Sequence, residues 1–131
     1  MTTRKAAHTK NWIRKDKRLA IYLRDGMACA YCGKGVEESG MALTLDHLLC
    51  RSKGGGNHEG NLLTCCHHCN CRRKTMDLGE WLEQEMNDAK AMAKWIAKHT
   101  ALDLRPFRIE AKKLIAERSP QAIPPTPTAR S

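Results

Sequence analysis

The chain is 131 residues long, which suits one folded domain with appendages, because two separate cores of half that size would each be marginal. Its formal net charge is +9, and no stretch approaches the roughly 20 apolar residues that are needed to span a bilayer. The N-terminus also lacks the apolar run of a signal peptide. The composition therefore excludes a membrane-spanning protein, and we expect a cytoplasmic one.

Positive charge is concentrated in the first 24 residues of the chain. This segment has a single acidic residue, Asp16, against a set of basic residues: Arg4, Lys5, Lys10, Arg14, Lys15, Lys17, Arg18 and Arg24. Such a block favours a polyanionic partner, because it neutralises phosphates and releases their counterions. A solvated basic arm is the alternative that charge alone leaves open.

A helix, a strand and a loop are expected in the first half of the chain. Apolar residues at helical spacing predict a basic amphipathic helix from Asn11 to Asp25, with Gly26 in the position of a C-terminal cap. The run MALTLDHLL over residues 41–49 has a β-branched centre and predicts a strand that enters a turn. Residues 51–60, RSKGGGNHEG, hold four glycines and are predicted to form a loop.

Helices are expected to dominate the second half. One is predicted to begin at Cys66 or His67 and to end near Lys74. A longer helix is predicted from Gly79 to His99, where an apolar stripe is formed by Leu82, Met86, Ala89, Ala93 and Ile96. The tryptophans that flank this stripe, Trp81 and Trp95, are expected to pack within the protein rather than to stack on bases.

A third helix is predicted from Arg105 to Arg118, because Pro106 is acceptable in a first turn. Beyond it the chain holds four of its five prolines, which predicts a disordered tail. The expected organisation has four parts: a basic arm over residues 1–10, the main folded domain over 11–78, a helical extension over 79–118 and the tail over 119–131.

Two C-x2-C pairs, Cys29/Cys32 and Cys66/Cys69, predict a structural zinc site. Each pair can present two thiolates from one tight turn to a tetrahedral ion, and Gly33 supplies the permissive backbone that such a turn commonly needs. Seven cysteines in a chain without a signal peptide favour metal ligation over disulfides. The site is expected to contribute much of the folding free energy.

The remaining cysteines, Cys50, Cys65 and Cys71, are expected to be thiols that bind no metal. Cys65 and Cys71 nevertheless crowd the second pair, and His67 and His68 lie inside it. The ligand assignment around the second pair therefore stays open at this point.

The segment between and around the cysteine pairs, LTLDHLLCRSKGGGNHEGNLLTCCHHCNCRRK, resembles the HNH nuclease family in its cysteine-flanked form. The shared pattern runs over about residues 27–75: a C-x2-C pair, an Asp-His step, a glycine-rich loop, an Asn-Leu-Leu step, and a second C-x2-C pair followed by Asn, Arg and Lys. The resemblance implies an α+β fold, in which a two-stranded ribbon packs on one helix around a single divalent ion. The N-terminal basic helix and the C-terminal helices would flank this core.

The resemblance also implies a role for each matching residue. His47 matches the general base, and Asp46 before it matches the metal-binding acid. Asn61 matches the middle asparagine, which holds the loop so that the histidine points correctly. Asn70 matches the last position, which is often histidine in the family, so this copy would be an HNN variant.

Phosphodiester hydrolysis independently requires these residue types. A neutral imidazole such as that of His47 suits the deprotonation of water, and we expect a backbone carbonyl near Asn61 to orient it. Oxygens of Asp46 and Asn70 suit a hard ion such as Mg²⁺, with Mn²⁺ or Ni²⁺ as other candidates. The resemblance implies products with 5′-phosphate and 3′-hydroxyl ends.

The expected partner is double-stranded DNA. Basic residues near the proposed centre are expected to contact phosphates: Arg51, Lys53, Arg72, Arg73 and Lys74. Three residues of the N-terminal helix, Arg14, Lys17 and Arg18, would extend the same surface. The sequence is also compatible with a homodimer and with a phage or host protein as a further partner.

Two other functions fit parts of the sequence. A zinc-ribbon protein could bind nucleic acid without chemistry, but it has no need of Asp46, His47 and Asn70 together. An RNA-directed nuclease could use the same centre, and the residues alone do not choose between the two nucleic acids.

Overall fold

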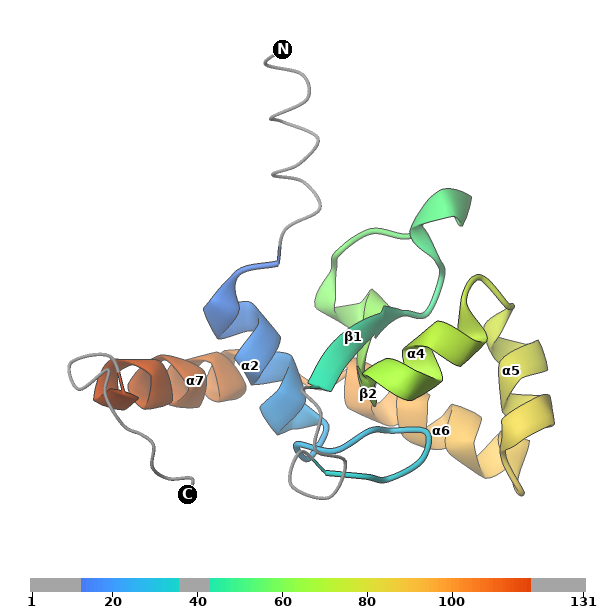
Figure 1. The fold of residues 1–131 in the computed structure, drawn as a ribbon. Coiled ribbons are helices and arrows are strands. Elements are labelled where there is room, and N and C mark those ends of the chain that lie inside the picture. Colours follow the sequence, from blue (N-terminus) through green and yellow to red (C-terminus); the bar gives the residue numbers. More distant parts are fainter. Residues whose placement is uncertain (1–12, 36–42, 119–131) are drawn as a thin grey trace, which may run out of the picture.

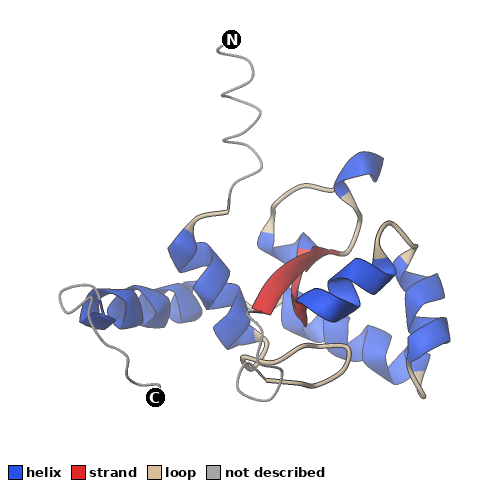
Figure 2. Ribbon diagram, in the orientation of Figure 1, coloured by secondary structure: helices blue, strands red, loops and turns tan. Residues whose placement is uncertain are grey.

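The computed structural model describes residues 13–35 and 43–118. The predicted basic arm and proline-rich tail lie outside these residues. The elements follow one another along the chain as α2 (Lys15–Arg24), β1 (Leu43–His47), η1 (Arg51–Lys53), η2 (Glu59–Asn61), β2 (Leu62–Cys66), α4 (His67–Arg73), α5 (Leu78–Glu85), α6 (Ala89–Thr100) and α7 (Arg105–Arg118). The two short strands lie among helices, which confirms the predicted α+β class (Figure 2).

The strands form an antiparallel ribbon that is central to the described part of the protein (Figure 1). The register pairs Leu43 with Cys66 and His47 with Leu62, so the Asp-His step lies at the end of β1, next to the start of β2. Helix α4 follows β2 directly and packs against both strands. This is the two-strand, one-helix arrangement that the family resemblance implies.

Every residue of β2 is buried, because the strand is covered on both faces. Successive side chains of a strand point to opposite faces, and here Leu62 joins one apolar cluster while Leu63 and Cys65 join another. The first cluster includes residues of α2 and α7, and the second lies against α5, α6 and the first cysteine pair. The ribbon therefore separates two small cores.

Helix α2 is tied to the outer edge of β2 by a buried ion pair. Arg24 and Asp25 are joined by hydrogen bonds of 2.7 and 3.0 Å, and the Asp25 carboxylate also accepts the backbone N–H of Thr64 at 2.9 Å. On the same edge, the carbonyl of Thr64 accepts the backbone N–H of Ala30 at 3.0 Å. These contacts satisfy backbone groups that an edge strand would otherwise leave unpaired.

The N-terminal helix ends as predicted and begins later. Gly26 adopts a φ of 90°, and the backbone N–H of Met27 donates to the carbonyl of Tyr22 at 2.8 Å, as in a Schellman cap. The helix begins at Lys15 rather than at Asn11. Ile13 precedes the helix and is buried in the cluster with α7.

The helix predicted from Gly79 to His99 is two helices, so that prediction was wrong. Met86 has extended backbone angles, and α6 begins after Asp88, whose carboxylate accepts the backbone N–H of Ala91 at 3.0 Å. This local cap gives the backbone an alternative to continuing the helix. Leu82 before the break and Ile96 after it still pack in one cluster.

The other two helices agree with prediction. Helix α4 spans His67–Arg73, and α7 spans Arg105–Arg118. Helix α7 packs against α2, with Ala111 fully buried between them and Arg108 donating to Asp16 at 3.1 Å. Among the described helices, none combines the length and the apolar character that a membrane crossing requires.

Candidate functional site

The first cysteine pair forms a tight turn before the ribbon. The backbone N–H of Cys32 donates to the sulfur of Cys29 at 3.4 Å, and the N–H of Gly33 donates to the carbonyl of Cys29 at 2.8 Å. Gly33 has a φ of 80°, which favours glycine, as the sequence predicted. The turn points both thiols to one side.

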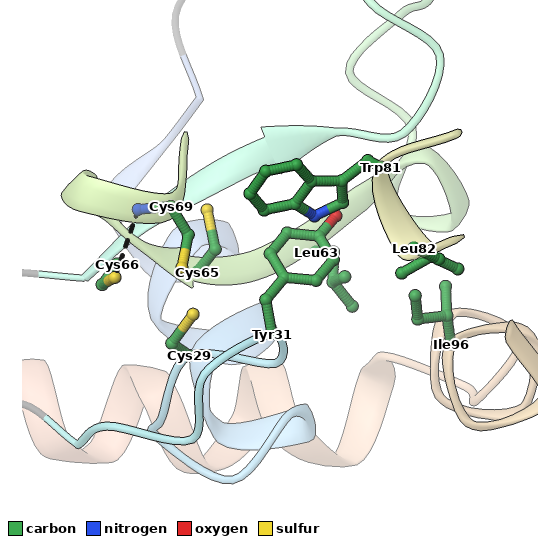
Figure 3. Close-up of a cluster of buried hydrophobic side chains, with 9 residues drawn as sticks. All are labelled: Cys29, Tyr31, Leu63, Cys65, Cys66, Cys69, Trp81, Leu82 and Ile96. Atoms are coloured by element: carbon green, nitrogen blue, oxygen red, sulfur yellow. Dashed lines mark hydrogen bonds between the residues drawn. The ribbon is translucent and has the colours of Figure 1, made fainter. Parts of the chain in front are cut away.

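The second pair lies where β2 passes into α4. Cys66 is the N-cap of α4, and its sulfur accepts the backbone N–H of Cys69 at 3.4 Å, so the helix start itself sets the spacing of the two thiols (Figure 3). The sulfurs of Cys29, Cys32, Cys66 and Cys69 all lie within 4.8 Å of one another. A single ion can therefore reach all four.

The geometry of this four-cysteine cluster fits zinc. A tetrahedral ion with Zn–S bonds of about 2.3 Å places its sulfurs about 3.8 Å apart. The sulfurs of Cys32 and Cys66 are separated by 3.8 Å. The donor set, four thiols in two knuckles, is that of a structural zinc site, as the sequence predicted.

Burial and local hydrogen bonds act differently on the four thiols. Burial raises the pKa of Cys29 and of Cys69. At Cys66 burial also raises the pKa, but the hydrogen bond from the Cys69 backbone and bonds with neighbouring thiols outweigh it, so the net pKa is lowered. Cys29 and Cys69 are therefore held as thiolates only when a cation compensates their charge, which couples metal binding to proton release.

The other cysteines and the histidines beside them lie outside the four-cysteine cluster. Cys65 is fully buried in the core, where desolvation raises its pKa. Cys71 is exposed on α4, with its sulfur 3.3 Å from Nε2 of His67 one helical turn earlier. Within residues 13–35 and 43–118, no second group of three His, Cys, Asp or Glu side chains converges on a common point.

Asp46 lies in a buried network at the end of β1. Only 3% of the residue is exposed, and its Oδ2 accepts the Tyr31 hydroxyl and the Arg73 guanidinium, each at 2.5 Å. Burial, followed by the charge of Asp46, raises the pKa of Tyr31, so this hydroxyl keeps its proton and remains a donor. Both bonds fall on Oδ2 rather than on Oδ1.

Arg73 is a structural residue, and its predicted contact with phosphate is wrong. The residue is 2% exposed, and besides Asp46 its guanidinium donates to the carbonyls of Leu48 at 2.7 Å and Met76 at 3.0 Å. A side chain with its donors committed to buried acceptors has none for a nucleic acid. It instead locks α4 to the end of β1.

Asn70 lies one helical turn before Arg73 on the same helix. Its Nδ2 donates to the carbonyl of Leu45 at 3.3 Å, beside Asp46 in β1. An amide that donates through nitrogen keeps its oxygen as an acceptor. The packing of α4 on β1 thus ties the amide of Asn70 to the backbone of β1 one residue before Asp46.

The imidazole of His47 contacts a side chain that sequence analysis did not single out. Nε2 lies 2.8 Å from Oδ1 of Asn57, in the loop between the strands. An amide oxygen only accepts hydrogen bonds, so in the neutral ring Nε2 carries the proton and Nδ1 has the lone pair. The expected orienting group, a backbone carbonyl near Asn61, is replaced here by this side chain.

Asn61 closes the loop that carries Asn57. Its amide donates to the carbonyls of Leu49 at 3.1 Å and Gly56 at 3.0 Å, and its Oδ1 accepts the Leu49 N–H at 2.8 Å. The loop is tight here, since a Cβ at Gly55 would lie 1.7 Å from the Leu49 carbonyl oxygen. Asn61 therefore joins the two ends of the loop.

The remaining basic residues differ in how far they are committed to protein contacts. Arg72 is paired with Glu85 at 2.6 Å and lies over the Trp81 ring, and Lys17 donates to the Asn57 carbonyl at 2.7 Å. Arg18 lies 3.4 Å from the Tyr22 hydroxyl. The other four, Arg14, Arg51, Lys53 and Lys74, are exposed at the surface, where Arg14 pairs with Asp16 at 3.7 Å and Lys53 donates to the Thr75 carbonyl at 3.4 Å.

Tyr31, Asn57 and the Arg24–Asp25 pair were all missed by sequence analysis. The position of Tyr31 inside the first C-x2-C pair was the available signal for a residue near the centre. For Asn57 the signal was weaker, because an asparagine in a glycine-rich loop is ordinary turn composition.

The ribbon, the helix that follows it and the four-cysteine cluster beside them form a ββα fold of the nuclease type. An Asp-His step lies at the end of its first strand. Residues 29–85 match the family described as HNH endonuclease. The family match is confined to this segment, and it confirms the resemblance seen in the sequence. No curated protein and no solved structure gave a significant match to the chain.

Proposed function

We propose that the protein is a divalent-metal-dependent endonuclease that hydrolyses the phosphodiester bonds of double-stranded DNA, leaving 5′-phosphate and 3′-hydroxyl ends. The observation that carries the proposal is the way the imidazole ring of His47 is oriented. Its Nε2 is held by Asn57 at 2.8 Å, so Nδ1 is the basic nitrogen, and the residue lies at the end of β1 next to Asp46. A binding module has no use for a histidine held in this way.

In the proposed reaction, His47 acts as the general base. Nδ1 takes a proton from water, whose oxygen forms a bond to phosphorus while the bond from phosphorus to the 3′-oxygen breaks. The leaving oxygen takes a proton from solvent, which gives the 3′-hydroxyl product. Asn61 contributes by closing the loop on which the orientation of His47 depends.

The oxygens of Asp46 and Asn70 suit a hard divalent ion, for which we propose Mg²⁺ with Mn²⁺ or Ni²⁺ as substitutes. When bound, such an ion stabilises the charge of the transition state and of the leaving oxygen. Arg73 holds Oδ2 of Asp46 and Asn70 donates its Nδ2 to Leu45. These contacts fix both side chains before any ion is present and leave one oxygen of each as a ligand.

Zinc is proposed to stabilise the fold rather than to take part in the reaction. The four-cysteine cluster would use all of its donors on one ion, and a tetrahedral site filled by four protein ligands has no open position for water. The exposed basic residues Arg14, Arg51, Lys53 and Lys74 are proposed to contact backbone phosphates, which fixes position more than sequence.

Plasmid cleavage tests this function. Wild type is expected to nick or linearise supercoiled DNA with added Mg²⁺, Mn²⁺ or Ni²⁺ and to stop with EDTA, while His47→Ala is inert. His68→Ala is the matched control, because His68 is an exposed histidine of α4 and should leave cleavage unchanged. Metal analysis of each protein should show that zinc is retained.

Other results would lead to different conclusions. Binding of DNA by wild type without cleavage under any of these conditions would favour a zinc-ribbon binding module. Cleavage of single-stranded RNA in preference to the plasmid would make RNA the substrate. Activity lost in His68→Ala and kept in His47→Ala would overturn the assignment of the base.

A further inference from the structure

A chain of contacts leads from the N-terminal helix to the proposed general base. The ammonium of Lys17 donates to the backbone carbonyl of Asn57 at 2.7 Å, and the side-chain oxygen of Asn57 accepts Nε2–H of His47 at 2.8 Å. Lys17 belongs to α2, which precedes the segment that matches the HNH family. The contact therefore comes from outside the residues that match the family.

Lys17 is directed into the protein rather than toward solvent. Its side chain is 23% exposed, and its ammonium also lies 3.9 Å from the carboxylate of Glu59. A phosphate contact, which the sequence suggested for Lys17, would compete with both of these partners. The geometry favours a role in holding the loop.

A second residue of the same helix holds the same loop. Arg24 donates to the backbone carbonyl of Glu59 at 3.0 Å, two residues after Asn57. Residues seven positions apart lie on one face of a helix, so Lys17 and Arg24 reach the loop from two successive turns. Helix α2 thus fixes the loop at two carbonyls, one on each side of residue 58.

The loop needs such anchors because of its composition. Gly54, Gly55 and Gly56 directly precede Asn57, and Gly54 has a φ of 97°. Glycine loses more conformational freedom on ordering than any other residue. Asn61 holds the loop at Gly56, and the contacts from α2 add a second hold that keeps the Asn57 side chain within reach of His47.

We propose that Lys17 and Asn57 are positioning residues for His47: Lys17 fixes the backbone of Asn57, and the Asn57 amide oxygen fixes the imidazole with Nδ1 free to act as base. This inference rests on the proposed nuclease function. It makes the N-terminal basic helix part of the active site, by contact with the loop and not only through its charge.

Lys17→Met tests the first link, with Lys15→Met as its matched control. Lys15 is exposed on the same helix, so both variants remove one charge, but only Lys17 contacts Asn57. Lys17→Met should lower kcat by roughly 10- to 100-fold, because small misplacements of a catalytic group have effects of this order. Lys15→Met should keep kcat. Both variants should raise KM for DNA slightly and reduce the salt dependence of KM, each to the same small extent, because each removes one positive charge.

A double-mutant cycle tests whether the two residues act in series. Asn57→Leu should lower kcat at least as much as Lys17→Met does, and the combined variant should lose no more than Asn57→Leu alone. Lys17→Arg keeps a donor and should recover part of the lost kcat. Thermal unfolding of each variant identifies any that fail to fold.

The tautomer of His47 gives a readout that needs no activity. In wild type, ¹⁵N–¹H correlation spectra should show the proton on Nε2 of the neutral ring. Lys17→Met and Asn57→Leu should give a mixture of tautomers, whereas Lys15→Met should match wild type. If wild type fails to cut DNA but shows this pattern, the nuclease function is wrong and the positioning stands. Equal kcat in Lys17→Met and Lys15→Met, or an unchanged tautomer in Lys17→Met, would overturn the inference.

Discussion

Arg73 and Asp46 form a buried ion pair, with Nη1 2.5 Å from Oδ2 and side chains that are 2% and 4% exposed. The pair joins α4 to the end of β1 and holds the carboxylate proposed to bind the catalytic ion. The same interaction therefore serves the fold and the site.

Arg73→Met is expected to lower the free energy of unfolding by about 3–5 kcal/mol, because it leaves the Asp46 charge buried without its partner. Urea denaturation of the zinc-loaded protein measures this loss. Arg72→Met is the control, since the neighbouring Arg72 pairs with Glu85 at the surface and should cost far less. Equal losses in the two variants would contradict the structural role of Arg73.

Tyr31→Phe is expected to keep zinc and to lower stability by about 1.5–3 kcal/mol, because a hydrogen bond to a charged acceptor is lost. Tyr22→Phe removes a bond of 2.9 Å to the neutral carbonyl of Leu43 and should cost less. Metal analysis and chemical denaturation of both variants make the comparison. Loss of zinc in Tyr31→Phe would contradict the expectation and show that the four-cysteine cluster depends on the hydroxyl, since the variant keeps the ring.

Gly55→Ala is expected to reduce cleavage strongly, because a Cβ there would lie 1.7 Å from the Leu49 carbonyl oxygen and force the loop open. The cost in stability is expected to be about 1–3 kcal/mol. Gly56→Ala provides a neighbouring control, since its Cβ would meet nothing within 4 Å. Activity and unfolding are measured for both, and equal behaviour would mean that the loop is not packed as described.

Cys32→Ser is expected to lose zinc and much of the stability that depends on it, whereas Cys71→Ser should retain one zinc per chain. The zinc content of the two variants is measured by inductively coupled plasma mass spectrometry, and their stability by thermal unfolding. Retention of zinc by Cys32→Ser, or its loss from Cys71→Ser, would change the ligand set.

Metal uptake by the stripped protein is expected to release protons, because burial raises the pKa of Cys29 and Cys69 above the usual thiol range. These thiols are protonated without metal and must lose their protons to bind it. Zinc affinity should therefore rise with pH and fall in acid. Calorimetric titrations in buffers of different ionisation enthalpy count the protons, and a buffer-independent heat would contradict the expectation.

Much of the fold followed from local signals in the sequence. The bounds of α7 agree with the pattern that begins near Pro106, and Gly26 ends α2 as expected. The break between α5 and α6 was missed because the apolar stripe continues across it, while the cap at Asp88 is a local preference that periodicity does not register.

The candidate site was predictable only in part. The cysteine spacing indicated the four-cysteine cluster directly, since each pair is local in the chain. Arg72 and Arg73 look alike in the sequence, and only the packing of α4 on β1 decides that the second is buried. The contact between His47 and Asn57 depends on how a glycine-rich loop closes. The two residues are ten positions apart in the sequence, and no helical or strand periodicity relates them.

The burial of β2 on both faces has a consequence for protein engineering. One face of the strand and part of its outer edge are covered by α2, Asp25 and α7, which lie outside residues 29–85. A fragment cut at the limits of the family match would present Leu62 and Leu45 to water and leave the Thr64 amide without its acceptor. Transplanting this ββα module into another protein would therefore require carrying α2 and α7 along, or supplying a substitute surface of the same shape.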